Sequence, residues 1–123
     1  MQQFVALGEI HGGWARGRLN DPEAGAQEST QALADFFSQG NRFGAPWYHG
    51  FIAELEVVAR RPDSALTLVE QGLANAEATG EHFVDPYLYR LRGDILLKLD
   101  LTNPAPAEGA FRTAIAIAKE QGR

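Results

Sequence analysis

The three histidines are the side chains in this sequence most suited to metal binding or to proton transfer near neutral pH. They are His11, His49 and His82, and they lie far apart along the chain. They form no zinc-binding motif with one another, and the chain has no cysteine to complete one. We therefore expect no metal site and no cofactor, and we assign structural or surface roles to these histidines.

Pairs of carboxylates are the second source of chemistry, because two acids can share general acid and base roles. Glu54 and Glu56 are two residues apart, which places them on different sides of a helix. Glu54 and Asp94 are equivalent positions of the repeat described below, and they could approach each other beside Trp14. This arrangement is the enzyme hypothesis. Solvated charges on helix faces are far commoner, so we expect no catalytic residue.

The glycines of GEIHGGWARG do not form a phosphate-binding loop, because neither GxGxxG nor GxxxxGK[ST] is present. The absence of cysteine also excludes disulfides and thiol catalysis. The net charge of −5 and the scattered basic residues argue against nucleic-acid partners and anionic membranes. No apolar run reaches membrane-spanning length, and the N-terminus lacks a signal peptide. We expect a cytoplasmic protein.

The sequence repeats with a period of about 40 residues. Proline-led motifs (DPEAG, RPDSA and PAPAEG) open three similar segments, and a glycine closes each one, at Gly40, Gly80 and Gly122. The third copy carries two extra residues, which fit the turn sequence LDLTNPAP. The apolar content of 45% is enough for one packed core. We therefore expect a single domain of three units, over about 3–41, 42–81 and 82–123.

Each unit is expected to contain two helices. In the second segment of the middle unit, apolar and small residues recur with the spacing of one helix face. These residues are Ala65, Val69, Gly72, Leu73 and Ala76. The third unit repeats the pattern at Ala107, Phe111, Ala114, Ile115 and Ala118. The first unit has a weaker version at Gly25, Ser29, Ala32, Leu33 and Phe36.

The first segments of the units are predicted to be helices over about 3–18, 45–59 and 85–99. Pro46 and Pro86 suit helix starts, and Asp85 suits an N-cap. Small residues at matched positions, such as Ala53 and Gly93, would let the paired helices approach closely. No alternating pattern of useful length predicts a strand.

This pattern resembles the tetratricopeptide repeat (TPR), whose unit has a small residue in its first helix and a small, an aromatic and an alanine position in its second. Gly93, Ala107, Phe111 and Ala114 occupy those positions in the third unit. The period of 40–42 departs from the usual 34, and Ser29 replaces the aromatic in the first unit. The resemblance implies an all-α, right-handed α-solenoid of three helix-turn-helix units.

Two stretches, YRLRGDILLKL and AFRTAIAIAKEQG, are also similar to the TPR-like tails of large bacterial multidomain proteins. Such proteins carry an ATPase module of the NB-ARC/STAND type, often with an adenylate or guanylate cyclase or a DNA-binding domain. The resemblance implies a scaffold or sensor arm of a bacterial signalling protein, and we expect the chain to be a segment of a larger protein. No nucleotide-binding or cyclase motif is present, so neither activity is carried over.

In tandem helical repeats the first helices line a concave, partner-binding surface. Residues at equivalent positions of these helices, together with their neighbours, form the candidate groove: Trp14, Trp47, Glu54, Tyr87, Arg90, Asp94 and Lys98. The alternative is that Trp47 and Tyr87 belong to the core between repeats. We expect a protein or peptide partner, or other domains of the parent chain. The alternative function is sensing of a small molecule or peptide in the same groove.

The last helix gives a second candidate surface. Phe111, Ile115 and Ile117 distribute apolar side chains around much of its circumference, whereas a terminal helix should be polar outside. We expect either the next repeat of a parent protein or a second copy of this chain to pack there, which would make the isolated chain a homodimer.

Overall fold

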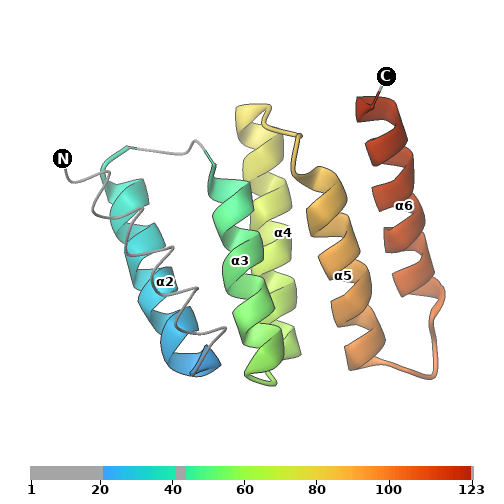
Figure 1. Cartoon of the computed structure of the whole chain (residues 1–123), viewed down its shortest axis with the longest axis horizontal. Coiled ribbons are helices and arrows are strands. Elements are labelled where there is room, and N and C mark those ends of the chain that lie inside the picture. Colours follow the sequence, from blue (N-terminus) through green and yellow to red (C-terminus); the bar gives the residue numbers. More distant parts are fainter. Residues whose placement is uncertain (1–20, 41–43, 123) are drawn as a thin grey trace.

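The described part of the protein consists of antiparallel helices connected by short turns (Figure 1). A computed structural model describes residues 21–40 and 44–122. Its helices are α2 (Pro22–Ser38), α3 (Ala45–Val58), α4 (Pro62–Thr79), α5 (Asp85–Leu99) and α6 (Ala105–Gln121). These ranges contain no strand, which confirms the all-α prediction. The helix predicted over 3–18, with Trp14 and His11, lies outside the described residues.

Local sequence signals explain where these helices begin and end. Each of the helices has a proline in its first turn, where the missing N–H has no intrahelical acceptor to lose. The Asp21 carboxylate caps α2 by accepting a hydrogen bond from the Ala24 N–H at 3.1 Å. Gly80 ends α4 with φ +76°, in the left-handed region that glycine adopts most easily. These ends agree with the predicted boundaries to within a few residues.

One predicted cap is wrong. Asp85 is the first residue of α5 and Val84 is the cap residue, so the Asp85 side chain does not cap the helix. Its carboxylate instead lies 2.9 Å from Nδ1 of His82 in the preceding turn. The hydrogen bond with Asp85 is the main reason why the pKa of His82 is raised. The carboxylate therefore fixes the α4–α5 turn to the start of α5.

Helix contacts follow the chain order, with one addition. Each described helix packs against the next, and α3 also packs directly against α5. Within the described residues, α2, α4 and α6 make no such contacts with one another. The two first-segment helices, α3 and α5, therefore form one adjoining layer.

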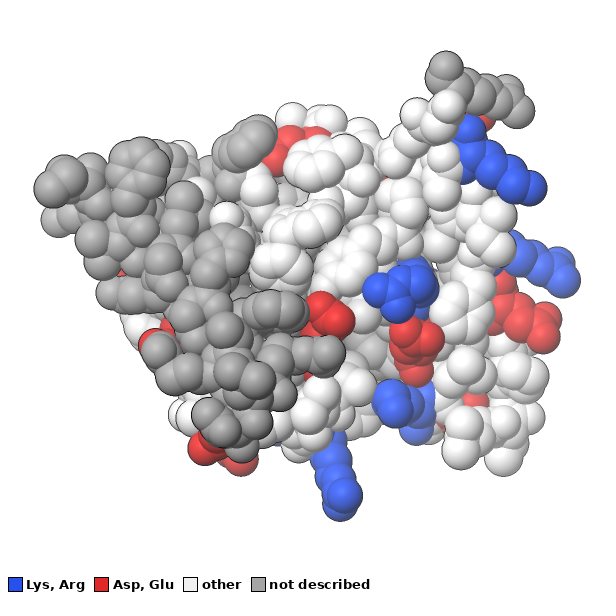
Figure 2. All heavy atoms as spheres, in the orientation of Figure 1, with Lys and Arg blue, Asp and Glu red and all other residues white. Residues whose placement is uncertain are grey.

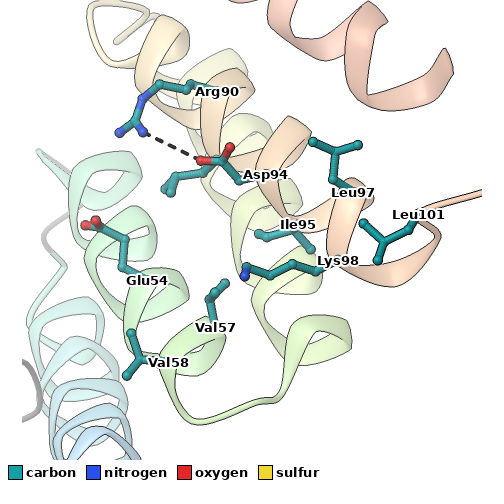
Figure 3. Close-up of a pocket in the computed structure, with 10 residues that line it drawn as sticks. Glu54, Val57, Val58, Arg90, Asp94, Ile95, Leu97, Lys98 and Leu101 are labelled. Atoms are coloured by element: carbon teal, nitrogen blue, oxygen red, sulfur yellow. Dashed lines mark ion pairs between the residues drawn. The ribbon is translucent and has the colours of Figure 1, made fainter. Parts of the chain in front are cut away.

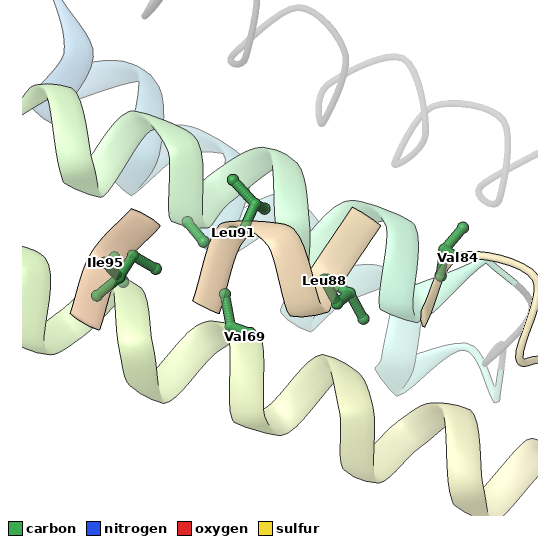
Figure 4. Close-up of a cluster of buried hydrophobic side chains, with 7 residues drawn as sticks. Val69, Val84, Leu88, Leu91 and Ile95 are labelled. Carbon is green, nitrogen blue, oxygen red and sulfur yellow. The ribbon is translucent and has the colours of Figure 1, made fainter. Parts of the chain in front are cut away.

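The core is divided into two clusters of buried side chains. The first joins α2 to α3 and includes Leu33, Phe36, Ile52 and Leu55. Every residue of the weak stripe predicted in the first unit is buried. The second cluster, shown in Figure 4, joins α3, α4 and α5 through Ala53, Ala65, Val69, Val84, Leu88, Leu91 and Ile95. Each fully buried leucine or isoleucine contributes about 1.5–3 kcal/mol of transfer free energy.

Glycine positions determine how closely the helices approach. A Cβ atom added to Gly72 of α4 would lie 3.1 Å from the Cβ of His49 on α3 and 3.3 Å from Cδ1 of Leu88 on α5. A Cβ atom added to Gly93 of α5 would lie 2.5 Å from Cε1 of Phe111 on α6. The predicted small-residue contact between the third pair of helices is thus confirmed at Gly93.

A buried histidine lies at the α3–α4 interface. His49 is 5% exposed, its Nε2 is 3.3 Å from the Asn75 side-chain nitrogen, and its ring packs on Phe37 with 5.8 Å between centroids. Burial lowers the pKa of His49 to about 4.

None of the helices in the described ranges combines the length and apolar character needed to cross a bilayer.

We predict that Gly93→Ala destabilises the protein. The new methyl group would overlap the Phe111 ring. Overpacking costs about 1–3 kcal/mol, while alanine gains about 1 kcal/mol in helix propensity, so the net loss in unfolding free energy is about 1 kcal/mol. Gly109→Ala in α6 is the matched control, because a Cβ atom there meets nothing within 4 Å. It should raise the unfolding free energy in the same urea titration, and equal effects of the two changes would contradict this packing account.

We also predict that protonation of His49 destabilises the fold in acid. The unfolded histidine titrates near about 6.5 and the folded one near 4, so between these values the unfolded state binds more protons. The unfolding free energy should therefore fall as pH drops through this window, by up to about 3 kcal/mol. Urea titrations at several pH values check this, and His49→Gln should remove this part of the pH dependence of the unfolding free energy.

The pKa of His82 is raised, so protonated His82 stabilises the folded state, and this stability is lost as pH rises. His82→Gln should therefore change the pH dependence of the unfolding free energy in the opposite sense to His49→Gln.

Candidate functional site

A hollow of about 490 Å³ lies between α3 and α5 (Figure 3). It combines charged side chains with apolar ones, and its lining residues are Glu54, Val57, Val58, Arg90, Leu91, Asp94, Ile95, Leu97, Lys98 and Leu101. Four of the predicted groove residues, Glu54, Arg90, Asp94 and Lys98, are thus brought together in one place. Trp14, the first member of the predicted row, lies outside the described residues.

The charged side of the hollow follows from helical spacing. Arg90, Asp94 and Lys98 are four residues apart and therefore project from the same face of α5. An ion pair joins Arg90 to Asp94, with 3.6 Å between Nη1 and Oδ2, and both side chains are about half exposed. Lys98 is exposed and forms no ion pair with any residue of the described ranges.

Glu54 is held from the opposite side of the hollow. Its Oε2 accepts a hydrogen bond from the Tyr87 hydroxyl at 2.5 Å, which connects α3 to α5. The guanidinium carbon of Arg90 lies 5.6 Å from the centroid of the same Tyr87 ring. Tyr87 therefore links the charged side chains of the hollow to Trp47 on α3 and, through it, to the neighbouring aromatic rings.

A cluster of aromatic rings continues from Tyr87 toward the start of α3. Trp47 packs against Phe51, Phe83 and Tyr87 with centroid distances of 5.4, 6.5 and 5.5 Å. Trp47 remains 39% exposed and Phe83 59% exposed, beside a smaller hollow of about 240 Å³. Trp47 and Tyr87 thus pack between helices, as the core alternative expects, and both remain partly exposed. Their role in binding a partner stays a prediction.

Sequence reasoning missed several members of this surface. Phe83 lies in the α4–α5 turn, and Leu101, 80% exposed, follows α5 in the turn that carries the two-residue insertion. Val58, at the end of α3, is 50% exposed. In the sequence, each of the three is a large apolar residue in or next to a predicted turn. The repeat pattern identifies only positions on helix faces, so it does not select them.

A third hollow, of about 580 Å³, lies between α5 and α6 and is mainly apolar. Its lining residues are Pro86, Arg90, Asp94, Phe111, Ala114, Ile115 and Ala118. Two of the residues predicted for the terminal surface, Phe111 and Ile115, are therefore together, and Ile115 is 56% exposed. Ile117, the third, does not line this hollow.

Charges on the described part of the surface are mixed in sign. Figure 2 shows lysine and arginine side chains interspersed with acidic ones on the visible face, without a continuous basic stripe. Within residues 21–40 and 44–122, no group of three or more potential ligands is arranged to hold a metal ion.

Comparison with known proteins gives no relative. No protein-family profile matches the chain, and no curated protein or solved structure matches it significantly.

We predict that Tyr87→Phe lowers the unfolding free energy by about 1–1.5 kcal/mol, because it removes a hydrogen bond to a carboxylate while the ring remains. Tyr89→Phe on the same helix is the control, since the Tyr89 hydroxyl forms no hydrogen bond with any described residue, and its effect should stay within about 0.5 kcal/mol. Chemical denaturation measures both. A Tyr87→Phe variant as stable as the parent would show that Glu54 is not held by this contact.

Proposed function

We propose that this chain is a non-catalytic protein-interaction module built as a TPR-like α-solenoid of three helix pairs. The direct packing of α3 on α5 supports this architecture, because α4 and α6 do not make the equivalent contact. Adjoining first helices and separated second helices are what a right-handed stack of helix pairs requires, with its concave side on the first helices. Matched small residues support the repeat as well: Ala65 and Ala107 are both buried.

The observation that carries the proposal is the continuous strip across α3 and α5. Phe83, Trp47 and Tyr87 form its aromatic part, and Arg90, Asp94 and Lys98 its charged part. Partly exposed aromatics give contact area at low entropic cost, which is why they are common at binding hot spots. The apolar residues that line the hollow together with these charges, such as Val58 and Leu101, would seat the side chains of a bound segment.

The electrostatics of the strip indicate the charge of the partner. Glu54 is engaged by the Tyr87 hydroxyl and Asp94 by Arg90, so both carboxylates already have hydrogen-bonding or ionic partners. Lys98 has none among the described residues. We propose that the groove binds a helical or extended peptide segment with an acidic residue placed for Lys98 and apolar residues placed for Val58 and Leu101.

The same contacts argue for a non-catalytic role. A general acid or base needs a carboxylate free to exchange a proton with substrate, whereas Glu54 and Asp94 are each held by a side chain of this protein.

From the resemblance to the TPR-like tails of bacterial multidomain proteins, we propose that the module works as an interaction or regulatory arm of a larger cytoplasmic signalling protein of bacterial type.

The volume of the hollow favours a second candidate. A space of about 490 Å³ falls within the range of small-molecule sites, roughly 300–1,000 Å³. A ligand-sensing module would use the same residues for a metabolite. Thermal-shift screening separates the two, because a metabolite that binds the folded state raises the Tm.

We predict that peptides selected from a displayed random library against the purified chain will depend on Lys98 and Trp47. Lys98→Glu should weaken the selected peptides about fivefold or more, because it reverses the available charge, and Trp47→Ala should weaken them by removing contact area. Lys119→Glu, on α6 and outside the three hollows, is the matched control. Peptides that bind the Lys98→Glu variant unchanged, or a selection that enriches none, would reject the groove as the binding site.

A further inference from the structure

The α5–α6 hollow is a second copy of a groove that this same molecule already fills. Each of its lining residues has a counterpart 40 residues earlier in α3 or 42 residues earlier in α4. The counterparts of Phe111 and Ala118, for example, are Val69 and Ala76. The equivalence uses the repeat that underlies the proposed function, but the surface is a different one.

In the earlier copy, α5 covers the groove. Val69 and Ala76 are 0% exposed there, and Leu88 of α5 is in the same buried cluster as Val69. Gly50 and Gly72 form the floor: a Cβ atom on Gly50 would overlap the Tyr87 ring, and one on Gly72 would lie 3.3 Å from Cδ1 of Leu88. The groove between α3 and α4 therefore accepts a helix through the adjacent pair Tyr87–Leu88.

In the later copy no described helix covers the groove. Ala118 is exposed and Ile115 is 56% exposed, whereas Leu73, the counterpart of Ile115, is partly buried against the second core cluster. Phe111 is larger than Val69, but its ring packs inward on Gly93 and leaves the hollow open. The later groove has walls at equivalent positions and lacks the covering helix.

Two changes in the floor set which helix fits. Ala114 replaces Gly72, and at that site a Cβ atom makes contacts of 3.1–3.4 Å that a shift of a few tenths of an ångström relieves. Arg90 replaces Gly50, and there a Cβ atom occupies the place that the Tyr87 ring takes in the earlier copy. It would also lie 3.2 Å from Cδ2 of Leu88, a contact that a shift of a few tenths of an ångström in that flexible side chain relieves. The later groove therefore accepts a leucine like Leu88 but excludes an aromatic residue directly before it.

We propose that the α5–α6 groove binds an amphipathic α-helix of a protein partner, in which a short residue such as alanine directly precedes the anchoring leucine. A second copy of this chain does not offer this pair on its described helices. Their exposed large apolar residues are Trp47, Val58, Leu99 and Ile115. The only one of these that follows a short residue is Ile115, which is already a wall of the groove.

The test uses peptides with the sequence of residues 82–101, added to the intact chain. The Tyr87→Ala peptide should bind about tenfold or more tightly than the native peptide, because it lacks the ring that Arg90 excludes. A Tyr87→Ala, Leu88→Asp peptide should lose binding at least tenfold, because a carboxylate replaces the leucine anchor. Titration calorimetry gives the affinities, and methyl NMR shifts of Ala114, Ile115 and Ala118 place the peptide.

Two variants of the chain complete the test. Arg90→Gly restores the floor of the earlier copy and should allow the native peptide to bind as well as the Tyr87→Ala peptide. Ile115→Lys should abolish binding of both, while Lys98→Glu, which disables the α3–α5 groove, should leave it unchanged. Binding that Lys98→Glu removes would assign the peptides to the other groove and overturn this proposal.

Equal binding of the two peptides to the unmodified chain would overturn the proposed selectivity, and absence of binding would overturn the site. Light scattering adds one more outcome. A dimer mass that Ile115→Lys reduces to that of a monomer would show that a second copy occupies the groove, which overturns the assignment to a partner helix. None of these outcomes depends on peptides selected for the α3–α5 groove.

Discussion

The close seating of α5 in the groove between α3 and α4 is the contact on which the rest of the structure depends. Gly50 and Gly72 make it possible, because a side chain at Gly50 would occupy the space of the Tyr87 ring and one at Gly72 would press on Leu88. With α5 seated, Val69, Leu88 and Ile95 become completely buried. The second core cluster is therefore a result of two missing side chains.

The same seating creates the candidate site. It brings the Tyr87 hydroxyl to Glu54 and the Tyr87 ring to Trp47, so that one residue connects core packing, aromatic surface and charged hollow. It also leaves the face with Arg90, Asp94 and Lys98 at the surface beside α3. The candidate binding surface and the core are therefore built from the same contacts, and a substitution at Tyr87 affects both.

The described surface has two hollows of different character beside α5. Between α3 and α5 the walls combine charged side chains with apolar ones, which suits a segment that carries both kinds of residue. Between α5 and α6 the walls are mainly apolar, and α5 adds Arg90 and Asp94, which suits an amphipathic helix. In the proposed repeat, Arg90 stands at the position of Gly50, where a Cβ atom would overlap the Tyr87 ring. This one difference separates the groove that α5 fills from the proposed helix-binding groove between α5 and α6.

The sequence alone determined the helices, because proline in the first turn, glycine near the end and a 3.6-residue apolar period are local signals. It also predicted which small residues would lie between helices, such as Ala53 and Gly93, and it grouped Glu54, Arg90, Asp94 and Lys98. The tertiary structure decided which charges are engaged, that Asp85 binds His82, and that Phe83 and Leu101 join the surface. Those outcomes depend on distances between side chains from different helices and turns, which periodicity within one helix does not fix.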